Sequence, residues 1–155
     1  MNARLQPPLP VIRPLGPDDV DRLIDIERAA YPYPWTRGIF ADCIRVGYPC
    51  TGLQLGPDLA GYIILSWGAG ECHLLNLCIH PDWQGQGHGS LLLEQGIKQA
   101  RSAGCAVMFL EVRQSNEGAA RLYQRRGFRH IGHRRNYYQA DDGREHAIVM
   151  ELDLV

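Results

Sequence analysis

The sequence predicts a single α/β domain whose central sheet mixes parallel and antiparallel strands. Its 155 residues are enough for one domain with its own hydrophobic core. Segments with helical periodicity alternate with segments of strand character, and no repeat or linker divides them. We therefore expect residues 11–155 to form one domain, behind a flexible lead-in over residues 1–10. The sheet should have about six or seven strands and be flanked by about four helices.

The first elements should be a strand and two helices. Residues 11–15 ("VIRPL") read as a short strand, and Asp18 can cap a helix over residues 18–30. The stretch "YPYPW" ends this helix, and Thr36 can cap the next one. The residues at helical spacing are Val20, Leu23, Ile24 and Glu27 in the first helix, and Ile39, Phe40, Cys43 and Ile44 in the second.

The middle of the chain changes to strands and then to a glycine-rich segment. Residues 50–56, 59–68 and 72–80 read as three strands joined by turns rich in Gly, Pro and Asp. The glycine-rich segment follows, and a helix with apolar residues at helical spacing should end near Gly104.

The last third supplies the strand that is expected to lie deepest. Residues 106–112 ("AVMFLEV") are almost all apolar, which is typical of a strand buried on both faces. A short helix should end at Gly127, and residues 129–152 read as two strands around an Asp-Gly turn. The strand–helix–strand connection around residues 72–113 should be parallel and right-handed.

Composition excludes several classes of protein. The net charge of −1 gives no basic surface for direct nucleic-acid binding. No apolar run is long enough to span a membrane, and the N-terminal residues lack the apolar segment of a signal peptide. The five cysteines are odd in number and form no CxxC pair, so we expect reduced, mostly buried thiols in a cytoplasmic protein. We expect a monomer.

The glycine-rich segment, "HPDWQGQGHGSLLL" over residues 80–93, is the first candidate site. No lysine precedes Ser90, so the segment is not a phosphate-binding P-loop. Its glycines alternate, which does not match the G-x-G-x-x-G dinucleotide fingerprint. A pyrophosphate can still bind at a place where a strand ends, glycines let the backbone approach the ligand closely, and a helix begins. A plain loop remains the alternative.

Two polar side chains near the end of the sheet strengthen the prediction of a ligand-binding site. Glu111 interrupts an apolar strand, where a carboxylate needs a partner, and Tyr123 lies on the following helix. Both are expected near the carboxyl ends of the central strands, where sheets of this kind bind ligands. The alternatives are a structural partner for Glu111, namely Arg113, Arg121 or a backbone donor, and a core aromatic role for Tyr123.

These motifs resemble a known family. Residues 84–89 ("QGQGHG") are similar to the Q/R-x-x-G-x-G/A coenzyme A loop of the GNAT superfamily of N-acetyltransferases. More narrowly, "YPYPWT", "LEVRQSN" and "RRNYYQADDGREHAIVMEL" resemble the RimI family. Members of that family acetylate the N-terminal alanine of the eighteenth protein of the small ribosomal subunit. The similarity covers residues 11–153 and implies the single-domain GNAT acetyltransferase fold.

The resemblance implies acetyl-CoA as acetyl donor, no metal, and the N-terminal segment of a ribosomal protein as partner. It implies that Glu111 is the general base, Tyr123 the general acid, and Asn116 a hydrogen-bonding partner of the coenzyme. The residues expected along the coenzyme are Leu77, Cys78 and Ile79 by main-chain groups, and Gly85, Gln86, Gly87, His88, Gly89 and Ser90 around the pyrophosphate. Those expected along the peptide are Tyr33, Trp35, Arg134, Tyr137 and Tyr138. One departure is that Gly85 and Gln86 are neutral where the family loop often carries a basic residue.

The chemistry explains why such groups are needed. An α-amino group has a pKa of about 7.7–8.0, so most of it is protonated at pH 7 and a base must remove the proton. We expect the apolar strand to raise the pKa of Glu111 and so improve it as a base, acting directly or through water. Backbone N–H groups of strand 72–79 would stabilise the oxyanion, and the phenol of Tyr123 would protonate the leaving thiolate.

Several alternatives remain beside this mechanism. Cys78 could carry the acyl group, although its context is apolar and no base is evident nearby. His130 and His133 have no further ligand close in sequence, so metal binding there is not expected. The acceptor could instead be a lysine side chain or a small amine, or the chain could bind coenzyme A without turnover.

Overall fold

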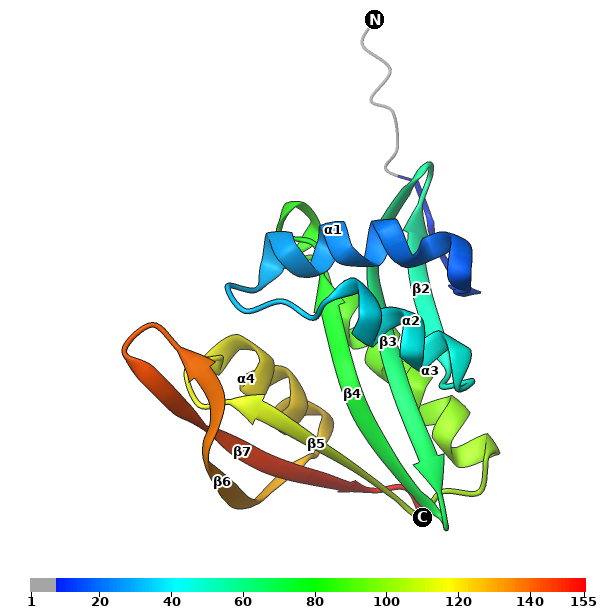
Figure 1. Ribbon diagram of the computed structural model, residues 1–155. Coiled ribbons are helices and arrows are strands. Elements are labelled where there is room, and N and C mark those ends of the chain that lie inside the picture. The colour runs from blue at the N-terminus through cyan, green and yellow to red at the C-terminus, as the bar shows by residue number, and fades with distance from the viewer. Residues whose placement is uncertain (1–7) are drawn as a thin grey trace, which may run out of the picture.

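The computed structural model describes residues 8–155, which form one seven-stranded sheet with helices on both faces (Figure 1). The sheet order is β1-β2-β3-β4-β5-β7-β6. The strands are β1 (Pro10–Pro14), β2 (Cys50–Leu55), β3 (Asp58–Gly68), β4 (Glu71–Ile79), β5 (Val107–Arg113), β6 (Arg129–Ala140) and β7 (Gly143–Asp153). The helices are α1 (Val20–Ala30), α2 (Arg37–Arg45), α3 (His88–Ser102) and α4 (Glu117–Arg126), with 3-10 turns η1 (Pro17–Asp19) and η2 (Pro81–Trp83).

The expected mixed α/β fold and its order of elements are confirmed. β4 and β5 pair in parallel across the helical connection, as expected, and the other neighbouring strands pair antiparallel. Residues 1–7 of the expected lead-in lie outside the described residues, and β1 begins at Pro10. Within residues 8–155, none of the helices combines the length and apolar character that crossing a bilayer requires.

Local side-chain chemistry sets the starts of the first two helices. The prediction that Asp18 caps α1 is wrong, because the helix is entered through η1 and Asp18 is exposed. Asp19 is the residue before α1, and its carboxylate stabilises the preceding turn by accepting hydrogen bonds from the Gly16 N–H at 2.9 Å and from the Arg13 guanidinium at 2.8 Å. The expected cap of α2 is confirmed, since the Thr36 hydroxyl accepts a hydrogen bond from the Ile39 N–H.

The sheet divides two hydrophobic clusters. Helices α1 and α2 pack on one face against β2, β3 and β4, while α3 and α4 cover the opposite face and reach across to β5 and β7 (Figure 1). All five cysteines are buried and unpaired within these layers.

The expectation that the apolar strand, β5, is buried on both faces is wrong. Its burial alternates, with Met108, Leu110 and Val112 buried in the α3/α4 cluster and the residues between them only half buried. The physical reason is that α1 and α2 pack on β2, β3 and β4 and leave the same face of β5 half open. Glu111 therefore lies on a half-open face.

A bulge in β4 separates the two halves of the sheet. Leu65 of β3 lies opposite Leu74, but Ile64 lies opposite Asn76, so Leu75 is an extra residue in β4. The parallel pairing of β4 with β5 stops at Leu74 and Leu110, at this same point. Beyond it the two strands diverge (Figure 1), and one edge of β4 is left without a strand partner. The divergence makes room for the candidate site.

Candidate active site

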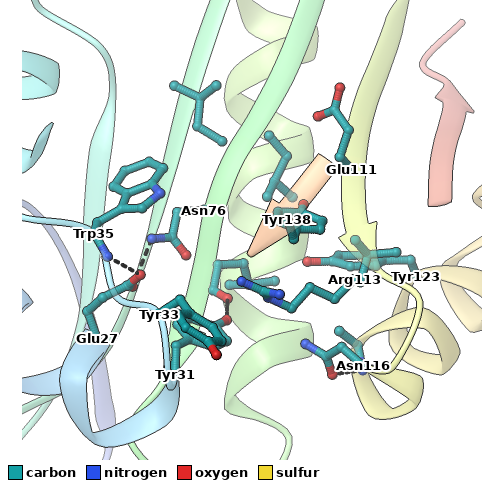
Figure 2. A pocket seen from close by; sticks show the side chains of 15 residues that line it. Glu27, Tyr31, Tyr33, Trp35, Asn76, Glu111, Arg113, Asn116, Tyr123 and Tyr138 are labelled. Carbon is teal, nitrogen blue, oxygen red and sulfur yellow. Dashed lines mark hydrogen bonds between the residues drawn. The ribbon is translucent and has the colours of Figure 1, made fainter. Parts of the chain in front are cut away.

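Two adjoining cavities occupy the region where β4 and β5 diverge. The smaller has a volume of about 210 Å³ and lies among α1, β4, β5 and the start of α4 (Figure 2). The larger has a volume of about 750 Å³ and extends along the end of β4 to the glycine-rich loop. The residues that line both cavities are Tyr31, Tyr33, Leu77, Arg113, Asn116, Ala119 and Tyr123.

Tyr123 stands at the junction of these cavities. The α4 helix places its ring in the core, where it is 6% exposed and packs against Phe128. Burial raises the pKa of Tyr123 well above its ordinary value, so the phenol is protonated at neutral pH. Among residues 8–155, no side chain or main-chain group is hydrogen-bonded to its hydroxyl. The hydroxyl is therefore available to hydrogen-bond to a ligand in these cavities.

Glu111 lines the smaller cavity from β5 but has partners that the sequence did not predict. Its Oε2 lies 2.5 Å from Nε2 of His73, and its Oε1 accepts a hydrogen bond from Nε of Arg134 at 3.2 Å. The hydrogen bond with His73 and the nearby guanidinium of Arg134 outweigh burial and lower the pKa of Glu111. The expectation of a raised pKa is wrong, because Glu111 faces the half-open side of β5, where His73 and Arg134 can approach it.

A second carboxylate in the smaller cavity belongs to Glu27 of α1, which is 2% exposed. It accepts hydrogen bonds from the Trp35 N–H at 3.1 Å, from Nδ2 of Asn76 at 2.9 Å and from the Tyr62 hydroxyl. Figure 2 shows the first two of these bonds joining the loop after α1 to β4. From the sequence, Glu27 was expected only as a residue at the helical spacing of the first helix. The signal was present, since a carboxylate at the helical spacing of the apolar face must find partners in the core.

The glycine-rich loop adopts a backbone that favours glycine. Gly85 and Gly87 have φ angles of 76° and 86°, and Gly87 is the residue from which α3 begins. Of the loop residues expected at the pyrophosphate, those that line the larger cavity are Gly85, Gly87, Gly89 and Ser90. Gln86 and His88 line neither cavity. The first N–H groups of α3 thus lie beside a cavity that is open to an anion.

The free edge of β4 supplies main-chain groups to the same cavity. Leu77 and Ile79 line it, and their carbonyl oxygens accept hydrogen bonds from the Tyr31 hydroxyl at 3.0 Å and from Nε2 of Gln84 at 2.8 Å. Cys78 lines neither cavity, and its side chain is buried on the α1 side of the sheet. Burial raises the pKa of the Cys78 thiol to about 12, so it stays protonated at neutral pH, which disfavours an acyl-carrying thiolate.

Asn116 links the two cavities from the start of α4. Its Oδ1 accepts a hydrogen bond from the Ala119 N–H at 3.2 Å and so caps the helix. This bond uses the oxygen of the amide and leaves the Nδ2 donors to face a ligand.

Three of the residues expected along the peptide line the smaller cavity, namely Tyr33, Trp35 and Tyr138. Arg113, which the sequence analysis did not place here, lies between two of them, with its guanidinium 5.4 Å from the Tyr33 ring centre and 4.5 Å from that of Tyr138. Each distance is within the range of a cation–π contact. Figure 2 shows the Arg113 side chain reaching between the rings of Tyr33 and Tyr138.

The other two residues expected along the peptide, Arg134 and Tyr137, line neither cavity. Arg134 pairs with Glu111 and lies 5.7 Å from the Tyr137 ring centre, and Tyr137 is 46% exposed. The cause is an irregularity in β6, where the register against β7 shifts between Arg134 and Tyr138 and Asn136 has a φ of 49°. This shift turns Tyr138 towards the cavity and leaves its neighbour on the surface.

Comparison with known proteins shows the family to which the chain belongs. The family described as "Acetyltransferase (GNAT) family" matches residues 20–128, and the chain belongs to this family. The family membership expected from the loop motif is confirmed.

Within this family, the chain is similar to two enzymes of known description and to one solved structure. The chain is 37% identical to the [ribosomal protein bS18]-alanine N-acetyltransferase of Escherichia coli (strain K12), over 92% of the chain and 97% of the relative. It is 35% identical to the enzyme of the same description from Haemophilus ducreyi, over 93% of the chain and 100% of the relative. The crystal structure of the ribosomal-protein-S18-alanine N-acetyltransferase from Escherichia coli superimposes with a TM-score of 0.89 at 36% identity, covering 94% of each chain. The expected likeness to the RimI family is thereby confirmed.

Proposed function

We propose that this chain is an acetyl-CoA-dependent N-acetyltransferase that acetylates the N-terminal alanine of ribosomal protein bS18. The observation that carries the proposal is the 37% identity to the Escherichia coli bS18-alanine enzyme over 97% of that relative's length. The cavities support it, because they bring a carboxylate and a protonated phenol to the edge of β4 where its pairing with β5 has ended.

The larger cavity fits the coenzyme. Its volume of about 750 Å³ is within the range of about 300–1,000 Å³ that is usual for small-molecule sites. The α3 N-terminus and the Gly85–Gly87 turn would bind the pyrophosphate through N–H groups, which compensates for the absence of a basic residue in this half of the loop. The pantetheine arm would lie along the free edge of β4 at Leu77 and Ile79, exchanging with the side-chain bonds now made there. The Asn116 amide would donate to the coenzyme.

The smaller cavity fits the acceptor peptide and the reaction. The α-ammonium group would transfer a proton towards Glu111, and the freed amine would attack the thioester carbonyl carbon. As the C–N bond forms, the oxyanion would be stabilised by N–H groups at the bulge in β4. The C–S bond would then break, and Tyr123 would give a proton to the thiolate sulfur.

The peptide would enter between the loop after α1 and the β6–β7 hairpin. Tyr33 of the loop and Asp141 of the hairpin are joined by a hydrogen bond of 2.5 Å, and Arg113 packs between the two segments. Tyr33, Trp35 and Tyr138 would contact the first residues of the peptide, as aromatic rings commonly do in peptide grooves.

The acceptor can be identified by mass spectrometry. The purified chain would be incubated with acetyl-CoA and a synthetic peptide of the bS18 N-terminus that begins with alanine. We expect one acetyl group, located on the α-amino nitrogen by fragmentation. The matched control is the same peptide with a blocked N-terminus and a free lysine. Acetylation of the control, or of free amines at a higher rate, would assign the chain to another GNAT specificity.

A further inference from the structure

Arg113 is a charged residue at the junction of the two cavities that the proposed reaction does not use. It is the last residue of β5 and lines both cavities. Its Nη1 donates hydrogen bonds to the Gln139 carbonyl at 2.8 Å and to Oε1 of Glu145 at 3.3 Å, and its guanidinium contacts the Tyr138 ring. These contacts hold the side chain against the β6–β7 hairpin.

The guanidinium of Arg113 has further donors that these contacts do not use. A guanidinium carries five N–H donors, and the bonds to the hairpin occupy the two on Nη1. Within residues 8–155, no acceptor is hydrogen-bonded to Nε or Nη2. The side chain is only 20% exposed, and an enclosed donor that stays unpaired costs free energy. Arg113 is therefore able to bind an oxygen atom of a ligand in the cavities.

The strand places Arg113 at a defined spacing from the proposed general base. Glu111 and Arg113 are two positions apart in β5, so their side chains emerge from the same face of the strand, about 7 Å apart along it. In the first residue of a peptide, three bonds of about 1.2–1.5 Å each link the amino nitrogen to the carbonyl oxygen. With a hydrogen bond of about 2.9 Å at each end, this unit can span the two side chains.

We propose that Arg113 donates hydrogen bonds to the carbonyl oxygen of the acceptor's first residue while the α-amino nitrogen lies at Glu111. The proposal rests on the N-acetyltransferase function proposed above, and it makes Arg113 a specificity-determining residue. The α-amino group of a peptide is separated from such a carbonyl by one carbon atom, whereas the ε-amino group of lysine is followed by methylene groups. Arg113 thus favours peptide N-termini over lysine side chains and simple amines.

The surroundings of Arg113 favour the peptide over the coenzyme as its partner. Tyr33 and Tyr138, whose rings contact the guanidinium, both line the smaller cavity, where the acceptor would bind. Glu145 offsets the positive charge of Arg113, which suits a neutral carbonyl better than a phosphate. The coenzyme phosphates would instead lie at the start of α3.

A change of one atom in the substrate tests the proposal. The alanyl bS18 peptide is compared with the same peptide in which sulfur replaces the oxygen of the first peptide bond, because sulfur is the weaker hydrogen-bond acceptor. We expect the natural protein to use the oxygen peptide with a kcat/KM roughly tenfold higher. In Arg113→Met, which has no donor, kcat/KM for the oxygen peptide should fall about 10- to 100-fold, and the preference for oxygen should disappear.

Glu145→Gln is the matched control for a structural effect. It breaks the ion pair that holds Arg113 on the hairpin but leaves the donors on Nε and Nη2 in place. Its preference for the oxygen peptide should therefore equal that of the natural protein. A purely structural role of Arg113 predicts instead that each variant loses the same factor in kcat/KM on both peptides.

The outcomes separate the two proposals. Equal use of the two peptides by the natural protein, or a preference for oxygen that persists in Arg113→Met, would overturn the role of Arg113 alone. A persisting preference together with weaker coenzyme A binding, measured by calorimetry, would assign its donors to the coenzyme. Failure of the natural protein to acetylate the oxygen peptide would overturn the proposed function as well. If Arg113→Met folds poorly, Arg113→Gln, whose amide can still donate to the hairpin, is measured with the same expected results.

Discussion

At the scale of single residues, the site depends on how each polar side chain is satisfied in a mostly apolar interior. Glu27 and Glu111 both face the smaller cavity, but their surroundings differ. Glu27 is enclosed by neutral donors that hold it in place, whereas Glu111 is held by His73 and Arg134 and faces the half-open side of β5. Tyr123 differs from both, because its hydroxyl has no partner within residues 8–155. The surroundings of Glu27 suit a structural role, whereas those of Glu111 and Tyr123 suit roles in a reaction.

Removing the Tyr123 hydroxyl should therefore lower activity without lowering stability. The Tyr123→Phe variant keeps the buried ring and loses a hydroxyl that makes no hydrogen bond within the described chain. We expect kcat to fall by about 10- to 100-fold, which is typical of a lost general acid, while the melting temperature is unchanged. Steady-state kinetics and thermal unfolding of the same preparation check this. An unchanged kcat would remove Tyr123 from the mechanism.

In contrast to Tyr123→Phe, the Glu27→Gln variant should lose stability. A glutamine has one carbonyl oxygen for three donors, so a buried donor loses its acceptor, at a cost of about 2 kcal/mol in the free energy of unfolding. Because Glu27 connects Trp35 to β4, we also expect a raised KM for peptide. Urea unfolding measures the first effect, with Asp25→Asn on the exposed side of α1 as control. Equal stability of both variants would show that the hydrogen bonds of Glu27 contribute nothing.

At the scale of elements, the site exists because two strands that start in parallel do not stay together. The bulge at Leu75 and the end of pairing at Leu74 coincide, and the free edge of β4 faces the start of α4. The sequence predicts the strands and the helix that begins after Gly87, because turn residues and periodicity are local signals. It could not predict the bulge, since "HLLNL" contains no Gly or Pro to mark one and strand register is decided by neighbours distant in sequence.

The dependence on neighbours distant in sequence also explains why the expectations about β5 and β6 were wrong. An apolar run such as "AVMFLEV" fits burial on both faces, but α1 and α2 end their cover at β4, so Glu111 meets partners from β4 and β6. Adjacent aromatic residues Tyr137 and Tyr138 look alike in sequence, and only the register shift in β6 decides which one faces the cavity. Long-range packing, which the sequence shows only indirectly, determines both.

The start of α1 gives a prediction about pH. The hydrogen bond from Arg13 and that from the Gly16 N–H lower the pKa of Asp19, so its carboxylate stabilises the fold above its unfolded pKa of about 3.9. This stabilisation should be lost as pH falls through the lower pKa of the folded state. We expect Asp19→Asn to lose roughly 1 kcal/mol at pH 7 and the difference from the natural protein to shrink below about pH 4. Unfolding curves at several pH values check this, and Asp18→Asn at the exposed neighbour should change little.

At the scale of the whole molecule, the two sides of the sheet contribute different parts of the candidate site. The α3/α4 side provides the helix ends and the glycine-rich turn that suit a phosphate-bearing ligand, and the α1/α2 side provides the loop and aromatic side chains that suit a peptide. The gap between β4 and β5 joins them, so donor and acceptor would meet beside Glu111 and Tyr123. The fold class, the order of elements and the loop motif could be predicted from sequence, whereas the pairing of Glu111 with His73 required the assembled sheet.

The most direct test of this account is the initial rate of α-amino acetylation of the alanyl bS18 peptide by the natural protein and by Glu111→Gln, with acetyl-CoA affinity measured in parallel. We expect steady acetylation by the natural protein and a rate lowered about 100-fold or more in the variant, with acetyl-CoA binding retained. Equal rates for the two proteins, or no acetylation of the α-amino group by the natural protein, would contradict it.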